Sequence, residues 1–137
     1  MIVEPITYKT FNGEEVTENF YFNLTEAELA QLQLKTPGGY KEKIEAIVKA
    51  KDQQALILAF TDIIDLAYGI KSDDGKRFIK TINGAPVVEA FKQTQAYSDL
   101  YMSLIFDEQK AVKFINGLIP EGLSERIDKV NPMISNA

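Results

Sequence analysis

The residues from Gly69 to Arg77 come nearest, in this sequence, to a phosphate-binding loop. Such a loop has the pattern G-x-x-x-x-G-K-[ST], in which the final hydroxyl binds Mg²⁺. Here one residue too many separates Gly69 from Gly75, and Arg77 stands where the hydroxyl is needed. Asp73 and Asp74 resemble part of a calcium loop, but the alternating oxygen ligands and terminal Glu of such loops do not follow. The stretch therefore predicts a solvated turn and neither a nucleotide site nor a metal site.

Two pairs of carboxylates are spaced closely enough for acid–base chemistry: Asp62 with Asp65, and Glu14 with Glu15. The first pair marks the only strip of a predicted helix polar enough to face water, and the second lies beside a predicted turn, so solvation explains both better. The sequence has no histidine and no cysteine, which removes the commonest general base, thiolate nucleophiles and the usual zinc ligands. We expect no catalytic residue, cofactor or metal, and hence no enzyme.

Size and charge restrict the partners. The chain has 137 residues, 45% of them hydrophobic, which is enough for one core. Its net charge of −5 gives no positive field to attract nucleic acid. No apolar run approaches the ~20 residues of a membrane span, and the start lacks a basic, apolar signal sequence. We therefore expect neither nucleic acid nor membrane binding, and a location in the cytoplasm where the chain is made.

One short segment runs against the overall charge. Residues 35–51 contain five lysines and two acids. An ordinary solvated helix face explains this segment, with Glu45 and Lys49 as a pair one turn apart. The alternative is a docking surface for an acidic partner.

The N-terminal segment predicts a β-hairpin. Apolar residues recur on one face of each strand: Ile6 and Tyr8 on the first, and Val16, Phe20 and Phe22 on the second. Between the strands, Asn12-Gly13 favours a type I′ turn, because both residues tolerate positive φ. Phe11, Phe20, Tyr21 and Phe22 lack the basic neighbours that base stacking would require, so we assign these aromatics to a core between hairpin and helices.

The first three helices are indicated by caps and apolar spacing. Thr25 and Glu28 form a capping box, and Pro37-Gly38-Gly39 ends that helix. A second helix is predicted over Tyr40–Ala50, and a third runs from an Asp52 cap to about Tyr68, followed by Gly69 in left-handed geometry. Inward-facing residues of these helices are Leu29, Leu32, Leu34, Tyr40, Ile44, Ile47 and Val48. The third helix is apolar nearly all round, which favours a central buried helix over an exposed partner-binding one.

The rest of the chain predicts a loop or small hairpin, then further helices. Residues 69–84 are broken by Ser72-Asp73-Asp74-Gly75 and Asn83-Gly84. Pro86 suits the first turn of a helix over about Val87–Lys92. A helical stripe follows, and Asp107 caps a last helix that Pro120 stops.

The predicted fold class is therefore α+β and mostly helical, with an N-terminal β-hairpin packed on five to six helices. We expect residues 1–120 to form a single globular domain, with the hairpin in 1–23 and the helices in 24–120. Residues 121–137 are expected to form a partly flexible C-terminal tail.

Four stretches of the sequence carry a resemblance to a known family. They are Tyr8 to Leu29, with FYFNLT and AEL; AYG of 67–69 leading to DGKRFIK of 74–80; AYSDL of 96–100; and FINGLIP of 114–120. In this order they resemble the tail assembly chaperones of long-tailed phages and prophages of Gram-positive bacteria.

The resemblance implies a function without catalysis. Such chaperones bind the long helical tape measure protein of an unfinished tail, keep it soluble and help tail tube subunits assemble around it, in the cytoplasm of the bacterial host. They are often made in two lengths through a ribosomal frameshift, which a flexible end after Pro120 would suit. The resemblance brings no residue-level binding site, and self-association remains open.

For a partner surface we single out the apolar residues after the last predicted helix, spaced like a weak amphipathic helix: Leu123, Ile127, Val130 and Met133. The alternative is that they cover the domain's own core. A different function fits the same composition, namely a small structural protein of the virion such as a head–tail joining or tail-end component. Purified particles distinguish the two, because a chaperone leaves and a structural protein stays.

Overall fold

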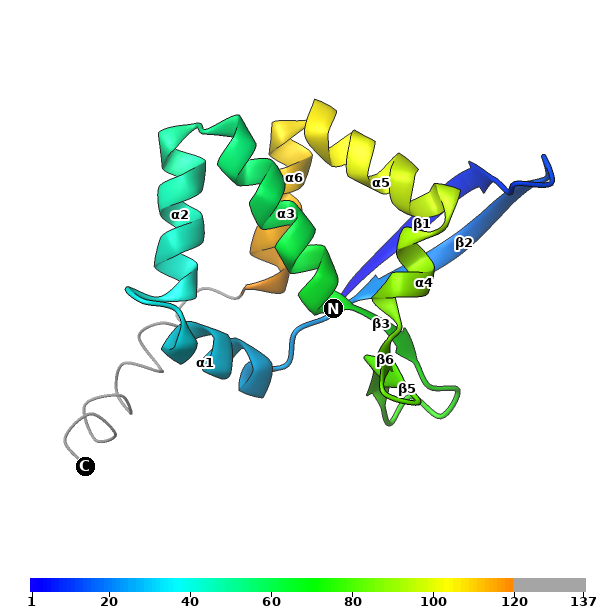
Figure 1. Cartoon of the computed structure of the whole chain (residues 1–137), viewed down its shortest axis with the longest axis horizontal. Coiled ribbons are helices and arrows are strands. Elements are labelled where there is room, and N and C mark those ends of the chain that lie inside the picture. Colours follow the sequence, from blue (N-terminus) through cyan, green and yellow to red (C-terminus); the bar gives the residue numbers. More distant parts are fainter. Residues whose placement is uncertain (120–137) are drawn as a thin grey trace.

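The computed structural model describes residues 1–119, which form six helices and six strands (Figure 1). In chain order these are β1 (Ile2–Lys9), β2 (Glu15–Phe22), α1 (Glu26–Lys35), α2 (Tyr40–Ala50), α3 (Gln53–Ala67), β3 (Tyr68–Lys71), β4 (Phe78–Ile79), β5 (Thr81–Ile82), β6 (Ala85–Pro86), α4 (Val88–Lys92), α5 (Gln95–Phe106) and α6 (Glu108–Leu118). The predicted fold class, α+β and mostly helical with an N-terminal hairpin, is confirmed.

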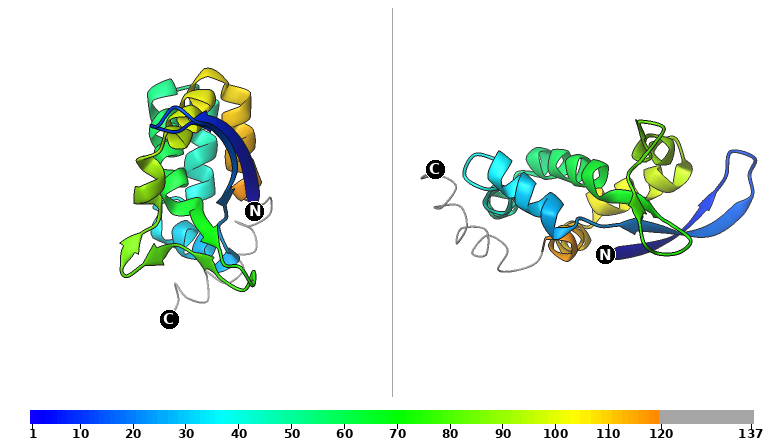
Figure 2. Two further views of the ribbon diagram at one scale, coloured as in Figure 1. Left: turned by 90° about the vertical axis from the view of Figure 1, so that its right-hand side faces the viewer. Right: turned by 90° about the horizontal axis from the view of Figure 1, so that it is seen from below.

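The strands form one larger sheet and one small ribbon. The order in the sheet is β1-β2-β3-β4, with antiparallel neighbours throughout, and β5 pairs only with β6. Strand β1 contacts α5 and α6, so the sheet packs on the C-terminal helices. The right-hand view in Figure 2 shows the tip of the β1–β2 hairpin reaching beyond the helices.

The turn of the first hairpin differs from the predicted type I′ turn. The N–H of Gly13 donates to the carbonyl of Thr10 at 2.9 Å, and the N–H of Thr10 donates to the carbonyl of Glu14 at 2.8 Å. Gly13 has a φ of +85°, whereas Asn12 does not adopt positive φ. This is the longer hairpin loop in which an ordinary turn precedes one left-handed glycine.

The pairing of the strands explains the longer loop. Tyr8 pairs with Val16, and Ile6 with Glu18. A two-residue turn would have paired Tyr8 with Thr17 instead, and because opposite residues share a face, the apolar sides of the two strands would then have faced opposite ways. Burial of one common face therefore overrides the local preference of Asn-Gly.

The second Asn-Gly pair forms the turn expected of the first. Asn83 and Gly84 have φ of +53° and +79° between the paired residues Ile82 and Ala85. Because Pro86 belongs to β6, the prediction that it starts a helix is wrong, and α4 begins at Val88. Neither strand of this short ribbon has a buried face, so local turn chemistry decides its geometry.

Gly69 does not end α3 in left-handed geometry as predicted. The chain passes directly from α3 into β3, where Gly69 pairs with Tyr21. A Cβ at Gly69 would overlap the ring of Phe78, so the absence of a side chain at Gly69 leaves room for this ring to pack against the backbone. The predicted small hairpin after α3 forms from β3 and β4, and in its turn the Asp74 carboxylate accepts hydrogen bonds from the Ser72 hydroxyl and the Lys76 N–H.

The predicted helix caps are confirmed. Thr25 and Glu28 form the complete capping box of α1, and Asp52 and Asp107 accept N–H groups at the starts of α3 and α6. Two side-chain predictions for the early helices are wrong. Leu34 is exposed, because Gln33 turns inward in its place. The side chain of Gln33 accepts a hydrogen bond from the N–H of Lys41 and donates one to the Glu42 carboxylate. The ion partner of Glu45 is Lys41, not Lys49, at 3.8 Å.

The core joins the sheet to the helices through aromatic rings. Phe22 is fully buried and meets the rings of Tyr68, Phe91 and Phe114 edge-on, at centroid distances of 5.7, 6.0 and 5.1 Å. The Tyr68 and Phe91 rings stack at 4.4 Å. Phe20 and Phe22 therefore belong to the core as predicted. The prediction is wrong for Tyr21, which is not part of the core cluster, and for Phe11, which lies exposed in the loop at the hairpin tip.

Helix α3 is central but not buried all round. It contacts α2 on one side and α6 on another, as Figure 1 shows. Its buried residues are Leu56, Ala59, Phe60, Ile63, Ile64 and Ala67. Leu58 is 61% exposed and Leu66 is also exposed, so the prediction of a buried helix holds for one broad face and fails for the other.

Candidate functional site

The carboxylates considered for acid–base chemistry are exposed, as Glu14, Glu15 and Asp62 are, or taken up by an ion pair, as Asp65 is. Asp65 pairs with the Lys92 ammonium at 2.7 Å and so ties α3 to α4. This hydrogen bond raises the pKa of Lys92, with a further contribution from the charges of Asp65 and Glu89. Asp62, three residues earlier, is exposed and forms no ion pair within residues 1–119. Within residues 1–119 no group of three or more acidic side chains is placed to hold a metal ion.

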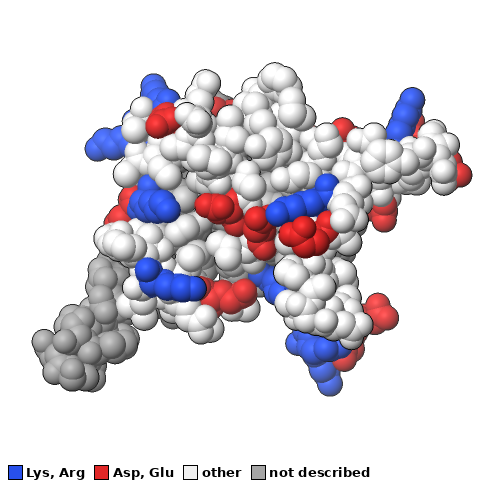
Figure 3. Space-filling view, viewed as in Figure 1, with Lys and Arg blue, Asp and Glu red and all other residues white. Residues whose placement is uncertain are grey.

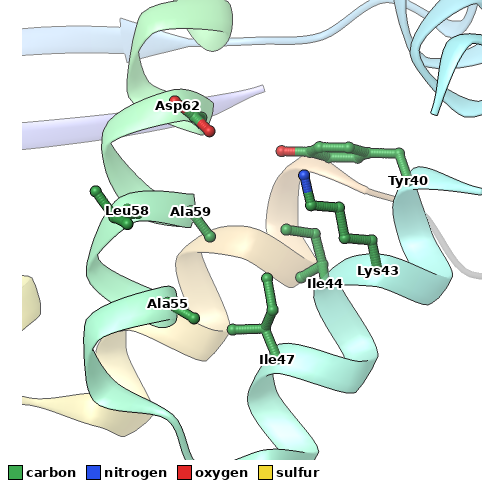
Figure 4. A pocket seen from close by; sticks show the side chains of 8 residues that line it. All are labelled: Tyr40, Lys43, Ile44, Ile47, Ala55, Leu58, Ala59 and Asp62. Atoms are coloured by element: carbon green, nitrogen blue, oxygen red, sulfur yellow. The ribbon is translucent and has the colours of Figure 1, made fainter. Parts of the chain in front are cut away.

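A groove between α2 and α3 is the hollow with the clearest binding character (Figure 4). Its volume is about 270 Å³, slightly below the roughly 300–1,000 Å³ of small-molecule sites. Helix α2 lines it with Tyr40, Lys43, Ile44 and Ile47, and α3 lines it with Ala55, Leu58, Ala59 and Asp62. Such a groove is open to solvent, mainly apolar and large enough for a few side chains.

The sequence builds this groove from large residues facing small ones. Tyr40, Ile44 and Ile47 recur along one face of α2, and opposite them Ala55 and Ala59 recur along α3. The methyl side chains of the alanines do not fill the space that the helix spacing leaves. The connection is short, because Lys51 adopts left-handed geometry and Asp52 caps α3 at once, so the helices form a tight hairpin.

Tyr40 brings an unsatisfied polar group to the groove. The residue is only 7% exposed, and its hydroxyl has no hydrogen-bond partner among the described residues. In Figure 4 the hydroxyl points across the groove toward α3. Burial, and to a lesser degree the negative charge of Asp62, raises the pKa of Tyr40 to about 12. The phenol is therefore neutral at physiological pH and offers both a donor and an acceptor.

The two rims of the groove carry opposite charges. Lys43 lies on the α2 side and Asp62 on the α3 side, and neither forms an ion pair within residues 1–119. Figure 3 shows basic side chains over α2 next to acidic side chains over α3. A partner that filled the groove would meet a positive charge on one side and a negative charge on the other.

Other apolar side chains are exposed away from the groove. The most exposed are Phe106, 81% exposed at the end of α5, and Phe11, 77% exposed at the hairpin tip. Strand β1 is an edge of the sheet, but Pro5 lacks an N–H and Lys9 is charged, both of which oppose the addition of another strand. The groove is thus the place where an apolar surface, an unpaired hydroxyl and free charges coincide.

The residues predicted as a partner surface, Leu123, Ile127, Val130 and Met133, lie outside the described residues. The groove is lined instead by residues of α2 and α3 that the sequence had placed in the core or on a solvated helix face. One signal was present: Ala55 and Ala59 are small residues one turn apart on an otherwise strongly apolar helix. The lysines of residues 35–51 were considered as a docking surface, and Lys43 is the one that lines the groove.

Comparison with known proteins gives one family. The sequence model described as phage tail assembly chaperone matches residues 1–135, which includes the C-terminal segment that carried none of the four resembling stretches. Neither curated proteins nor solved structures gave a match. Within residues 1–119 no helix is both long and apolar enough to cross a bilayer. Because the family model covers nearly the whole sequence, this chain belongs to the phage tail assembly chaperone family.

Proposed function

We propose that this chain binds the tape measure protein of a long-tailed phage, keeps it soluble and promotes assembly of tail tube subunits around it. It acts without catalysis, in the cytoplasm of a Gram-positive bacterial host. The observation that carries the proposal is the match to the chaperone family over residues 1–135. Membership gives the general role in tail assembly, and the identity of the partners follows from the resemblance of the motifs.

Two physical features support a role in protein binding. A chaperone must offer apolar surface reversibly, and this chain exposes large apolar side chains together with an open apolar groove. It must also keep the complex soluble, which a net charge of −5 favours.

The C-terminal segment is proposed to contact the tape measure protein. Leu123, Ile127, Val130 and Met133 would form its apolar stripe, following a single globular domain of residues 1–120. A longer form made by frameshifting would extend this partly flexible tail. Replacing Ile127 and Val130 by Ser is expected to weaken the hold on the tape measure protein without changing the thermal unfolding of the domain.

Co-expression tests the proposal directly. The tape measure protein is produced with and without this chain, and its soluble fraction and its retention on the tagged chain are measured. We expect the chaperone to raise both, and to be missing from purified particles. A chain found in finished virions at a fixed stoichiometry would support the alternative, a head–tail joining or tail-end protein, and contradict the proposal.

A further inference from the structure

The groove between α2 and α3 has the shape of a helix-binding site. Its lining follows the spacing i, i+4, i+7 on both walls: Tyr40, Ile44 and Ile47 on α2, and Ala55, Ala59 and Asp62 on α3. Residues at this spacing extend over about 10 Å of helix, or roughly two turns. Grooves of this kind take the apolar face of an amphipathic helix, anchored by side chains at the same spacing.

We propose that this groove binds about two turns of an amphipathic helix of the tape measure protein. The inference rests on the proposed function and adds to it the place and the chemistry of recognition. Apolar side chains of the bound helix fill the space beside Ala55 and Ala59. An acidic residue lies beside Lys43 on one flank and a basic residue beside Asp62 on the other.

The hydroxyl of Tyr40 is the feature that packing among residues 1–119 does not explain. Burying a hydroxyl without a partner costs free energy, and a phenylalanine would fill the same space without that cost. Its neutral phenol lies at the end of the groove where Asp62 also lies. The hydroxyl itself has almost no accessible surface, so it bonds a polar group of the bound helix as the ring turns outward on binding, and the cost of leaving it unpaired is then recovered.

The free charges on the rims select the occupant. A helix with the same charge on both flanks would be repelled by Lys43 or by Asp62, whereas oppositely charged flanks match both and fix the direction of the helix. This asymmetry argues against a purely apolar segment as the occupant.

Filling the groove is the first test. Ala55→Leu adds a larger side chain at a half-buried groove position, and Ala46→Leu makes the same change on the exposed side of α2. Affinity of the full-length chain for the co-expressed tape measure protein is expected to fall about tenfold or more with Ala55→Leu and to stay unchanged with Ala46→Leu. Circular dichroism confirms that both variants are folded. Equal binding by both variants would overturn the inference.

Removing the hydroxyl is the second test. Tyr40→Phe is expected to lower affinity roughly two- to tenfold, as the loss of one hydrogen bond implies. The same variant is expected to unfold at an equal or higher temperature, because the hydroxyl has no partner within residues 1–119. Tyr21→Phe, on the face of the sheet away from the helices, is the control and changes neither. A fall in both affinity and stability would show a merely structural tyrosine and count against the inference.

The charges are tested by reversal. Lys43→Glu weakens binding, and reversal of one acidic residue of the tape measure helix to Lys restores it; failure of every such reversal would contradict the charge match.

Three outcomes separate the inference from the proposed function. If the wild-type chain retains no tape measure protein, both are wrong. If it does, and the groove variants retain it equally, the function stands and the groove is not its site. If Ala55→Leu instead dissociates an oligomer, a second copy of the chain occupies the groove. If it cancels a stabilisation that residues 120–137 provide, the chain's own C-terminal segment occupies the groove. Either result overturns the inference.

Discussion

Truncating Phe22 measures how strongly the hairpin is held to the helices. The side chain is fully buried and meets three other rings. A buried aromatic side chain removes about 150 Å² or more from water. At about 25 cal/mol per Å² this is roughly 4 kcal/mol, in the range of 3–5 kcal/mol measured for Phe→Ala in cores. We therefore expect Phe22→Ala to lower the free energy of unfolding by about 4 kcal/mol.

The matched control is Phe11→Ala, which removes the same atoms from an exposed loop position. Its expected effect lies within about 0.5 kcal/mol of zero. Urea unfolding followed by circular dichroism gives both values, and the slope with denaturant should not change if only stability changes. A cost below about 1 kcal/mol for Phe22→Ala, or equal costs for the two variants, would refute the assignment of Phe22 to the centre of the core.

Three further predictions concern the connections between elements. Gly69→Ala forces a methyl group into the ring of Phe78 and is expected to cost about 1–3 kcal/mol in thermal unfolding; unchanged stability would show that the ring moves freely. Lys80→Met removes an ammonium that pairs with Glu28 at 3.2 Å, and should cost about 1 kcal/mol at neutral pH. Burial raises the pKa of Glu28, but a backbone hydrogen bond and the Lys80 charge outweigh it and hold the pKa below its ordinary 4.5. The part of the wild-type advantage that comes from Glu28 is therefore complete above pH 4.5 and is lost as the pH falls through the lowered pKa, whereas the hydrogen bonds from the Lys80 ammonium to the carbonyls of Asn23 and Leu66 remain. An advantage unchanged in acid would contradict the pairing with Glu28. Asn83→Val places a β-branched residue at φ +53° and should disrupt the β5–β6 turn by about 1–2 kcal/mol, whereas Asn83→Gly should keep it, as proteolysis of this ribbon will show.

Features set by neighbours in the sequence were predictable. The capping box of Thr25 and Glu28, the caps at Asp52 and Asp107, and the bounds of α2 follow from a few adjacent residues. Each of the three caps satisfies backbone groups inside its own helix, so no knowledge of the fold is needed.

Features set by distant contacts were not predictable in the same way. Asn12-Gly13 and Asn83-Gly84 are the same dipeptide, yet only the second forms the type I′ turn, since only the first joins strands that must bury a common face. The role of Gly69 depends on Phe78, which reaches it through the β3–β4 pairing. The groove was not predicted for the same reason: it forms where the alanines of α3 lie opposite the isoleucines of α2.

In the groove, the residues that stabilise the chain are separate from those proposed to recognise a partner. Its floor, with Ile44 and Ala59, is buried and belongs to the core, so substitutions there affect folding and binding together. Its rim, with Lys43, Leu58 and Asp62, is exposed and contributes little to the fold. If the proposed helix binding is correct, related chaperones change the charges of the rim to suit the helix of their own partner while the floor stays apolar. If so, exchanging only the rim residues between two such chaperones should exchange their partners, whereas exchanging the floor should change stability and affinity together without changing which partner is preferred.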